Sequence, residues 1–279
     1  MKIILFILSV LTFEVNGVSF QLNEVEGGTF VMGATEEQGS EEEISIDKPV
    51  HSVAVPSFYI GQTEVTNRLW NAIMEVDSGV WSVDGNITSW AAADCPVVLH
   101  SWFECQEFIR RLDSITGIDF RLPHEAEWEY AARGGQKAKT TRYAGSDNAN
   151  EVSWLYRNSG NRSHAVAQKK QNELGLYDMT GNVWEWCLND FYAYTSSPEV
   201  ITISAADTTK VLKVMRGGSW DNALSNSHLS VRRTEYPQYA FHDCGLRLAL
   251  SKEMTEKEKK KLEAEINKMN KKFSKQKDE

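Results

Sequence analysis

The chain lacks several features that mark specialised classes of protein. None of its four cysteines belongs to a CxxC or CxxH pair, which argues against a structural zinc site. It has no basic stripe and carries a net charge of −9, so nucleic acid is not expected as its main partner. The apolar run at its N-terminus, Ile3–Phe13, is too short to cross a bilayer comfortably, so no stable membrane span is expected.

What the chain contains is typical of a globular protein. It has 279 residues, 41% hydrophobic and 25% charged, enough for one large domain or two small ones. Nine tryptophans are many for this length, and 18 glycines accompany them. This combination favours a loop-rich fold around a packed aromatic interior.

The N-terminal apolar run resembles a secretory signal peptide. Lys2 precedes it, and Gly17 and Ser19 offer small residues for cleavage, which predicts a signal peptide over residues 1–19. No cysteine follows the run directly, so a bacterial lipid anchor is not indicated. The prediction is therefore a secreted or periplasmic protein of the cell envelope, and the alternative is a buried N-terminal strand.

The cysteines allow two interpretations. In an exported protein an even number permits two disulfides with three connectivities, and spacing does not choose among them. Alternatively, the four side chains are small buried hydrophobes. The residues concerned are Cys95, Cys105, Cys187 and Cys244.

Periodicity predicts a few regular elements joined by long loops. Apolar residues at helical spacing predict three helices, and alternating residues bounded by turns predict strands. The helices are expected over 64–75, 101–115 and 124–133, and the strands over 20–33, 50–61, 211–219 and 245–250. A charged helical tail is expected over 251–279, with one thin apolar seam that would let it pair with a partner helix.

The stretch Gly175–Tyr192 is the most distinctive of the chain. Gly181 and Asn182 tolerate a positive φ, so they favour a tight turn among large aromatic residues. Asp178 and Glu185 lie in the same stretch and need partners if they are buried. The turn is therefore interpreted either as a plain aromatic core or as a turn braced by a hard cation.

Five motifs occur together and in order, and the set resembles the formylglycine-generating enzyme (sulfatase-modifying factor) family. The resemblance covers residues 20–250. It implies one α+β domain with sparse secondary structure, a variant of the C-type lectin fold. The motifs are Val25–Gly33 (VEGGTFVMG), Arg121–Gly135 (RLPHEAEWEYAARGG), Gly181–Trp186 (GNVWEW), Arg216–Trp220 (RGGSW) and Gly245–Arg247 (GLR).

The resemblance implies the family's fold but not its catalytic chemistry. Enzymes of the family oxidise a substrate cysteine with two active-site cysteines that bind copper, and soft thiolates suit Cu(I). The matching positions here hold Asn222 and Ser227, so no catalytic residue is transferred and no copper is expected. A second branch of the family holds iron with histidines of a separate helical domain, and no HxxxH cluster occurs here.

One site of the family is compatible with this sequence. The resemblance implies a structural calcium held by the side chain of Asp178, the carbonyls of Gly181 and Val183, and the carboxylate of Glu185. An aspartate at position 178 adds a charge to the oxygen ligands that calcium prefers.

The function expected from these residues is an exported, non-catalytic domain that binds a protein, peptide or glycan. Two alternatives stay open: an atypical cysteine-oxidising enzyme of the formylglycine-generating type, and a structural subunit of an envelope assembly that docks through its tail. The ligand face is expected in the irregular segment 221–242, where short polar groups and aromatics mix. Its residues are Asn222, Asn226, His228, Arg232, Tyr236, Tyr239 and His242.

Overall fold

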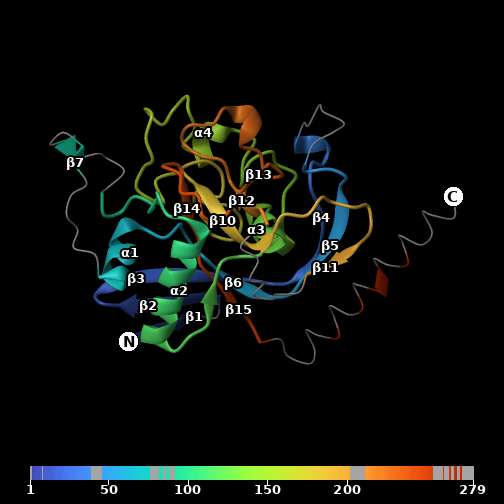
Figure 1. Cartoon of the computed structure of the whole chain (residues 1–279). Coiled ribbons are helices and arrows are strands. Elements are labelled where there is room, and N and C mark those ends of the chain that lie inside the picture. The colour runs from blue at the N-terminus through green and yellow to red at the C-terminus, as the bar shows by residue number, and fades with distance from the viewer. Residues whose placement is uncertain are drawn as a thin grey trace.

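The computed structural model describes residues 2–7, 9–38, 46–75, 82–83, 86–87, 92–201, 211–253, and residues 260, 264, 267, 268 and 271. These form an α+β domain of short helices and small sheets, as the sequence predicts (Figure 1). The helices are α1 (Asn67–Met74), α2 (Trp102–Thr116), α3 (Glu125–Ala132) and α4 (Ala149–Val152), with 3-10 turns η1 (Glu36–Gln38), η3 (Gly135–Lys137) and η4 (Leu224–Asn226).

The described strands form four sheets. The order of the six-stranded sheet is β1 (Lys2–Ile7), β2 (Val10–Val15), β3 (Val18–Val25), β6 (Phe58–Gly61), β15 (Ala249–Ser251) and β9 (Phe120–Arg121). The four-stranded sheet runs β13 (Arg232–Glu235), β12 (Lys213–Arg216), β10 (Trp184–Asp190) and β14 (Cys244–Leu246). The smaller sheets are β11 (Glu199–Val200), β5 (His51–Val55) and β4 (Gly28–Met32), and β7 (Ser82–Val83) with β8 (Asn86–Ile87).

Local capping explains where the main helices begin and end. Ser101 and Glu104 form a capping box at the start of α2, and Gly117 ends that helix in the left-handed conformation. The α3 helix begins with a similar box, in which His124 takes the capping position and Glu127 bonds back. The three predicted helices are therefore confirmed to within three residues at each end.

Two apolar clusters flank the four-stranded sheet. One joins α1 and α2 to Trp186, and the other surrounds Trp128 of α3. In Figure 1, α1 and α2 lie at one end of the molecule, β4, β5 and β11 lie at the other, and α3 lies between them. Several charged side chains are buried in this middle region, and the functional question turns on how they are satisfied.

The first residues of the chain take part in the six-stranded sheet. The β1 and β2 strands pair antiparallel, and β2 pairs with β3. Phe13 and Val15 are each 2% exposed and belong to the core. Within the described residues, the N-terminal segment is therefore in strands, and Phe13 and Val15 are buried, while the signal peptide over residues 1–19 and export stay predictions.

All four cysteines are buried, and no disulfide joins them. Burial raises the pKa of each thiol, to about 11 at Cys95. They occupy the core as small hydrophobes, which was the second of the two interpretations.

The predicted tail lies mostly outside the described residues. Those described beyond Glu253 are helical and exposed, whereas the seam residues Leu262, Ile266, Met269 and Phe273 are not among them. The contact with a partner helix therefore stays a prediction. Within the described part of the chain, no helix combines the length and apolarity needed to cross a membrane.

Candidate functional site

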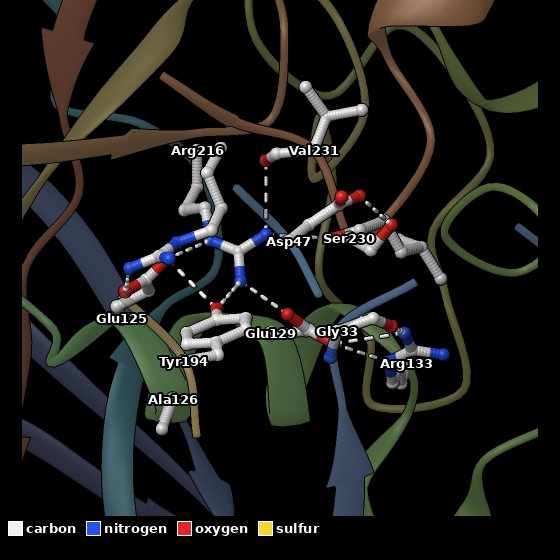
Figure 2. Close-up of polar contacts among 12 residues, drawn as sticks. Gly33, Asp47, Glu125, Ala126, Glu129, Arg133, Tyr194, Arg216, Ser230 and Val231 are labelled. Atoms are coloured by element: carbon white, nitrogen blue, oxygen red, sulfur yellow. Dashed lines mark hydrogen bonds and ion pairs between the residues drawn. The ribbon is translucent and has the colours of Figure 1, made fainter. Parts of the chain in front are cut away.

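A buried guanidinium lies at the centre of the domain. Arg216 of β12 is 0% exposed and pairs with Glu125 and Glu129, two carboxylates on one face of α3 (Figure 2). It also donates to the carbonyls of Leu229 and Val231, at 3.1 and 3.0 Å. Burial opposes the charge of Arg216, but the neighbouring phenol and carboxylates raise its pKa above the ordinary value. This network anchors β12 to α3, and α3 presents no unpaired charge to a ligand there.

A second buried ion pair holds the tryptophan-rich turn. Glu185 of β10 accepts from Arg247 at 2.7 Å and from the indole of Trp128 at 2.7 Å. Arg247 also donates to the carbonyls of Gly61 and Tyr177, each at 2.9 Å. A carboxylate has about four lone-pair positions, and Arg247 and Trp128 make four contacts with this one. Glu185 is therefore satisfied without a cation.

Calcium binding by Asp178, Gly181, Val183 and Glu185 stays a prediction, and the structure describes the surroundings of its two carboxylates. Asp178 adopts a φ of 57° and is buried; its Oδ2 accepts from Ala167 N at 2.7 Å, and its Oδ1 has no partner. Gly181 adopts a φ of 75° in the turn. A Cβ at this position would lie 2.3 Å from the carbonyl oxygen of Trp154. Over the described residues, no three His, Cys, Asp or Glu side chains converge as a metal cluster. Asp178 Oδ1 is therefore open to a cation, and the oxygens of Glu185 already accept bonds from Arg247 and Trp128.

The positions that hold thiolates in the family's enzymes are used here to brace a loop. The Oδ1 atom of Asn222 accepts from the backbone N of Ser219 at 2.8 Å and from its Oγ at 2.9 Å. Ser227 is 1% exposed and donates to the carbonyl of Ala223 at 3.1 Å. Both side chains act within the loop itself.

The seven predicted ligand residues differ in their exposure to solvent, and four of them are exposed. Tyr236 and Tyr239 are 45% and 50% exposed, with ring centroids 6.1 Å apart, and the exposed His242 packs on Trp220. Asn226 is exposed at the end of η4. These residues remain accessible to a ligand.

Two of the predicted residues face inward. Arg232 is 6% exposed, binds both oxygens of Glu125 at 2.5 and 2.8 Å, and stacks on Tyr194. His228 is half-buried beside Ser230, at 3.1 Å, and burial lowers the pKa of its imidazole. The structure therefore assigns Arg232 to the interior network and leaves it out of the exposed surface.

Two exposed apolar residues that the sequence did not single out lie beside the tyrosines. Leu99 is 46% and Phe103 is 37% exposed. Backbone bonds from Leu99 N to Phe241 O and from Trp102 N to Pro237 O join their segment to that of the tyrosines. In the sequence, Phe103 falls outside the apolar face of the predicted helix over 101–115. This position indicates that its side chain is exposed, and it could have identified Phe103 as a surface residue. We call Leu99, Phe103, Tyr236, Tyr239 and His242 the aromatic edge.

Asn222 also lines a polar cavity. Its volume is about 610 Å³, and it is lined mainly by amides and charged groups. Among its lining residues are Asn148, Asn150, Asn158, Lys169 and Asn222. The Lys169 ammonium is already bound to the carbonyl of Asn150 at 2.8 Å and lies over the ring of Trp154. This cavity holds no thiol.

Comparison with known proteins decides the family. Residues 20–252 match the family model of the sulfatase-modifying factor enzyme 1-like domain. The chain belongs to this family. The expected resemblance is thereby confirmed, and four of its five motifs, all except Val25–Gly33, contribute side chains to the buried networks described above.

The curated relatives include both active and inactive proteins. The chain is 29% identical to the chaperone protein LppX of Paenibacillus barcinonensis, over 84% of this chain and 91% of that protein. It is 27% identical to the formylglycine-generating enzyme of Streptomyces coelicolor, over 82% and 88%. It is 26% identical to the inactive C-alpha-formylglycine-generating enzyme 2 of Bos taurus, over 84% and 89%. Membership in the family is thus compatible with an active enzyme and with an inactive protein.

Solved structures confirm the fold. Treponema denticola variable protein 1 aligns with a TM-score of 0.72 and 25% identity, over 86% of this chain and 98% of that chain. PvdO from Pseudomonas aeruginosa aligns with a TM-score of 0.69 and 22% identity, over 82% and 93%. The single α+β domain of the formylglycine-generating enzyme type is therefore shown.

Proposed function

We propose that this chain is an exported, non-catalytic binding domain on the scaffold of the formylglycine-generating enzymes. The observation that carries the proposal is the loop at Ser219, where Asn222 and Ser227 replace the thiolates and are engaged in loop hydrogen bonds. The four cysteines present are all buried, and burial raises the pKa of each. The thiolate is the form that attacks a substrate or binds copper, so these thiols suit neither task.

The aromatic edge is the binding surface in this proposal, and its ligand is a peptide segment of another protein. Tyrosines supply rigid contact area at low entropic cost, and aromatic residues are enriched among those that dominate binding energy. Leu99 and Phe103 add apolar area that a sugar does not require. A peptide with apolar side chains therefore fits this edge better than a glycan.

The binding surface is tested by selecting ligands from a random linear peptide library with the full chain. The double variant Tyr236→Ala, Tyr239→Ala is expected to weaken binding of a selected peptide about 30-fold or more, at about 1 kcal/mol for each ring. Isothermal titration calorimetry measures the affinity. Tyr192→Ala is the matched control, because Tyr192 is 65% exposed and lines a cavity that none of the edge residues lines.

Two outcomes would contradict this surface. One is a double variant that binds the selected peptide as tightly as the Tyr192→Ala control. The other is binding on a glycan array, with no peptide selected from the library.

The absence of oxidase activity is a separate prediction. The full chain, incubated with a Cys-x-Pro-x-Arg peptide, copper and oxygen, is expected to form no aldehyde by mass spectrometry. The Streptomyces coelicolor relative, treated in the same way, is the positive control. Aldehyde formation that disappears in a Ser219→Ala variant would replace the binding proposal with the enzyme alternative.

A further inference from the structure

Leu99 has a backbone conformation that its side chain does not favour. Its φ is 65°, in the left-handed region, where the Cβ is crowded by the following carbonyl oxygen. Seven described residues other than glycine have a positive φ, and four of them are asparagine or aspartate, which tolerate it. Among these seven, Leu99 is the one with a large apolar side chain. The backbone at this position is therefore strained by the residue that it carries.

The surrounding contacts hold Leu99 in this conformation. Its backbone N donates to the carbonyl of Phe241 at 2.9 Å. The carbonyl of the next residue, His100, accepts from the indole of Trp186 at 3.2 Å. The ring of His100 stacks on Trp70, with centroids 4.0 Å apart. Because its neighbours are fixed, Leu99 cannot relax, whereas a glycine would adopt the same conformation without strain.

The side chain of Leu99 does not stabilise the core. It is 46% exposed, and within the described part of the chain it belongs to none of the apolar clusters of the interior. A leucine at this position therefore has neither a relaxed backbone nor a fully buried side chain. Strained residues that their surroundings hold in place cluster at ligand-binding and active sites. The strain and the exposure of Leu99 together point to a role in binding.

The other exposed apolar residues of the aromatic edge surround Leu99. Phe103 follows on the same segment, and Tyr236 and Tyr239 belong to the segment that Leu99 joins through its bond to Phe241. Single exposed hydrophobic residues are ordinary on a protein surface, but a contiguous group of them marks an interaction site. Leu99 therefore presents its side chain where a ligand of this edge would lie.

We propose that Leu99 is the anchor of the aromatic edge, the residue whose burial contributes most to the affinity, and that the bound peptide covers it with a large apolar side chain. The inference rests on the proposed function and adds which contact dominates binding and which side chain the ligand supplies. Burying two apolar side chains against each other removes both from water. The strained backbone lowers the stability of the free protein and keeps the side chain exposed for the ligand.

Replacing Leu99 with alanine and with glycine tests the anchor and the strain together. Both variants remove the contact, so each is expected to weaken calorimetric binding of a library-selected peptide about tenfold. At an ordinary φ, glycine is less stabilising than alanine, but at a φ of 65° the order reverses. The Tm of Leu99→Gly is therefore expected to lie about 2–4 °C above that of Leu99→Ala. Leu99→Met, which keeps an apolar side chain of similar volume, should retain most of the affinity.

A double-mutant cycle identifies the ligand side chain. Each large apolar residue of the selected peptide is replaced with alanine, and each peptide is measured against the wild type and Leu99→Ala. The residue that covers Leu99 should weaken binding to the wild type about tenfold and have little further effect on Leu99→Ala.

Val50→Ala and Val50→Gly are the matched controls. Val50 is 41% exposed, its φ is not positive, and it directly precedes β5. In Figure 1, β5 lies at the other end of the molecule from α2, which carries Phe103. Both control variants should bind the peptide as the wild type does, and here the glycine variant should have the lower Tm.

Other results would overturn the inference. A lower Tm for Leu99→Gly than for Leu99→Ala would show that the backbone is not strained, and purely additive effects in the cycle would show that no peptide side chain covers Leu99. Full affinity in Leu99→Ala, with loss in the double variant Tyr236→Ala, Tyr239→Ala, would leave the proposed function without Leu99 as its anchor. Full affinity in both, or no selected peptide, would remove the aromatic edge as the binding surface and Leu99 with it.

Discussion

Replacing Arg216 with methionine is expected to lower the free energy of unfolding by about 3–5 kcal/mol, the range for removing one partner of a buried ion pair. The variant leaves Glu125 and Glu129 buried without their shared guanidinium, although each keeps an arginine of its own. It also deprives the carbonyls of Leu229 and Val231 of a donor. Urea denaturation followed by circular dichroism measures the loss.

The control for this variant is the same substitution in an exposed pair. Arg68 contacts Asp94 at 2.9 Å, and the two side chains are 52% and 66% exposed. Arg68→Met is expected to cost less than about 1 kcal/mol, because water screens the pair. If Arg216→Met fails to fold, Glu129→Gln, which keeps the shape of the side chain, supplies the comparison. Equal losses at Arg216 and Arg68 would show that the buried network contributes little.

Gly181→Ala is expected to destabilise the protein by about 2–4 kcal/mol. About 1 kcal/mol arises from a side chain at a φ of 75°, and the rest from overpacking. The new Cβ would lie 2.3 Å from the carbonyl oxygen of Trp154, which accepts a bond from Asn182. The turn must therefore shift away from its neighbouring segment. Thermal unfolding measures the change.

Gly160→Ala separates the two contributions. Gly160 has a φ of 64°, but a Cβ there meets nothing within 4 Å. It is expected to show the backbone cost alone, about 1 kcal/mol. A Gly181→Ala variant no less stable than Gly160→Ala would mean that the turn does not need the close approach.

The sequence predicts the local structure well because its signals are local. The apolar spacing and the capping residues Ser101 and His124 lie within the helices that they define. The same holds for Gly181, whose positive φ was expected from the residue type. Five motifs in register then identified the fold, and the comparison with known proteins confirmed it.

The partners of buried charges could not be predicted because they lie far away in sequence. The sequence groups Glu185 with Asp178, seven positions away, as ligands of one cation, and gives no sign of Arg247, 62 residues away, which donates to the carboxylate of Glu185. Arg232 was placed on the ligand face, yet its strand sets it opposite Arg216, and both turn toward Glu125. The sequence gave no sign that Glu64 is buried, at 2% exposed, since an isolated glutamate before a helix is usually exposed. Composition of a loop likewise does not tell which polar residues point inward.

The place of β15 has a consequence for how the protein is made. This strand, formed by Ala249–Ser251, lies between β6 and β9, which it joins across the six-stranded sheet. A ribosome that has not yet released residue 251 therefore holds a chain with two unpaired strand edges. Sheets that depend on such distant pairing fold slowly, and open edges favour aggregation in the meantime. The six-stranded sheet can therefore be completed only after residue 251 has left the ribosome.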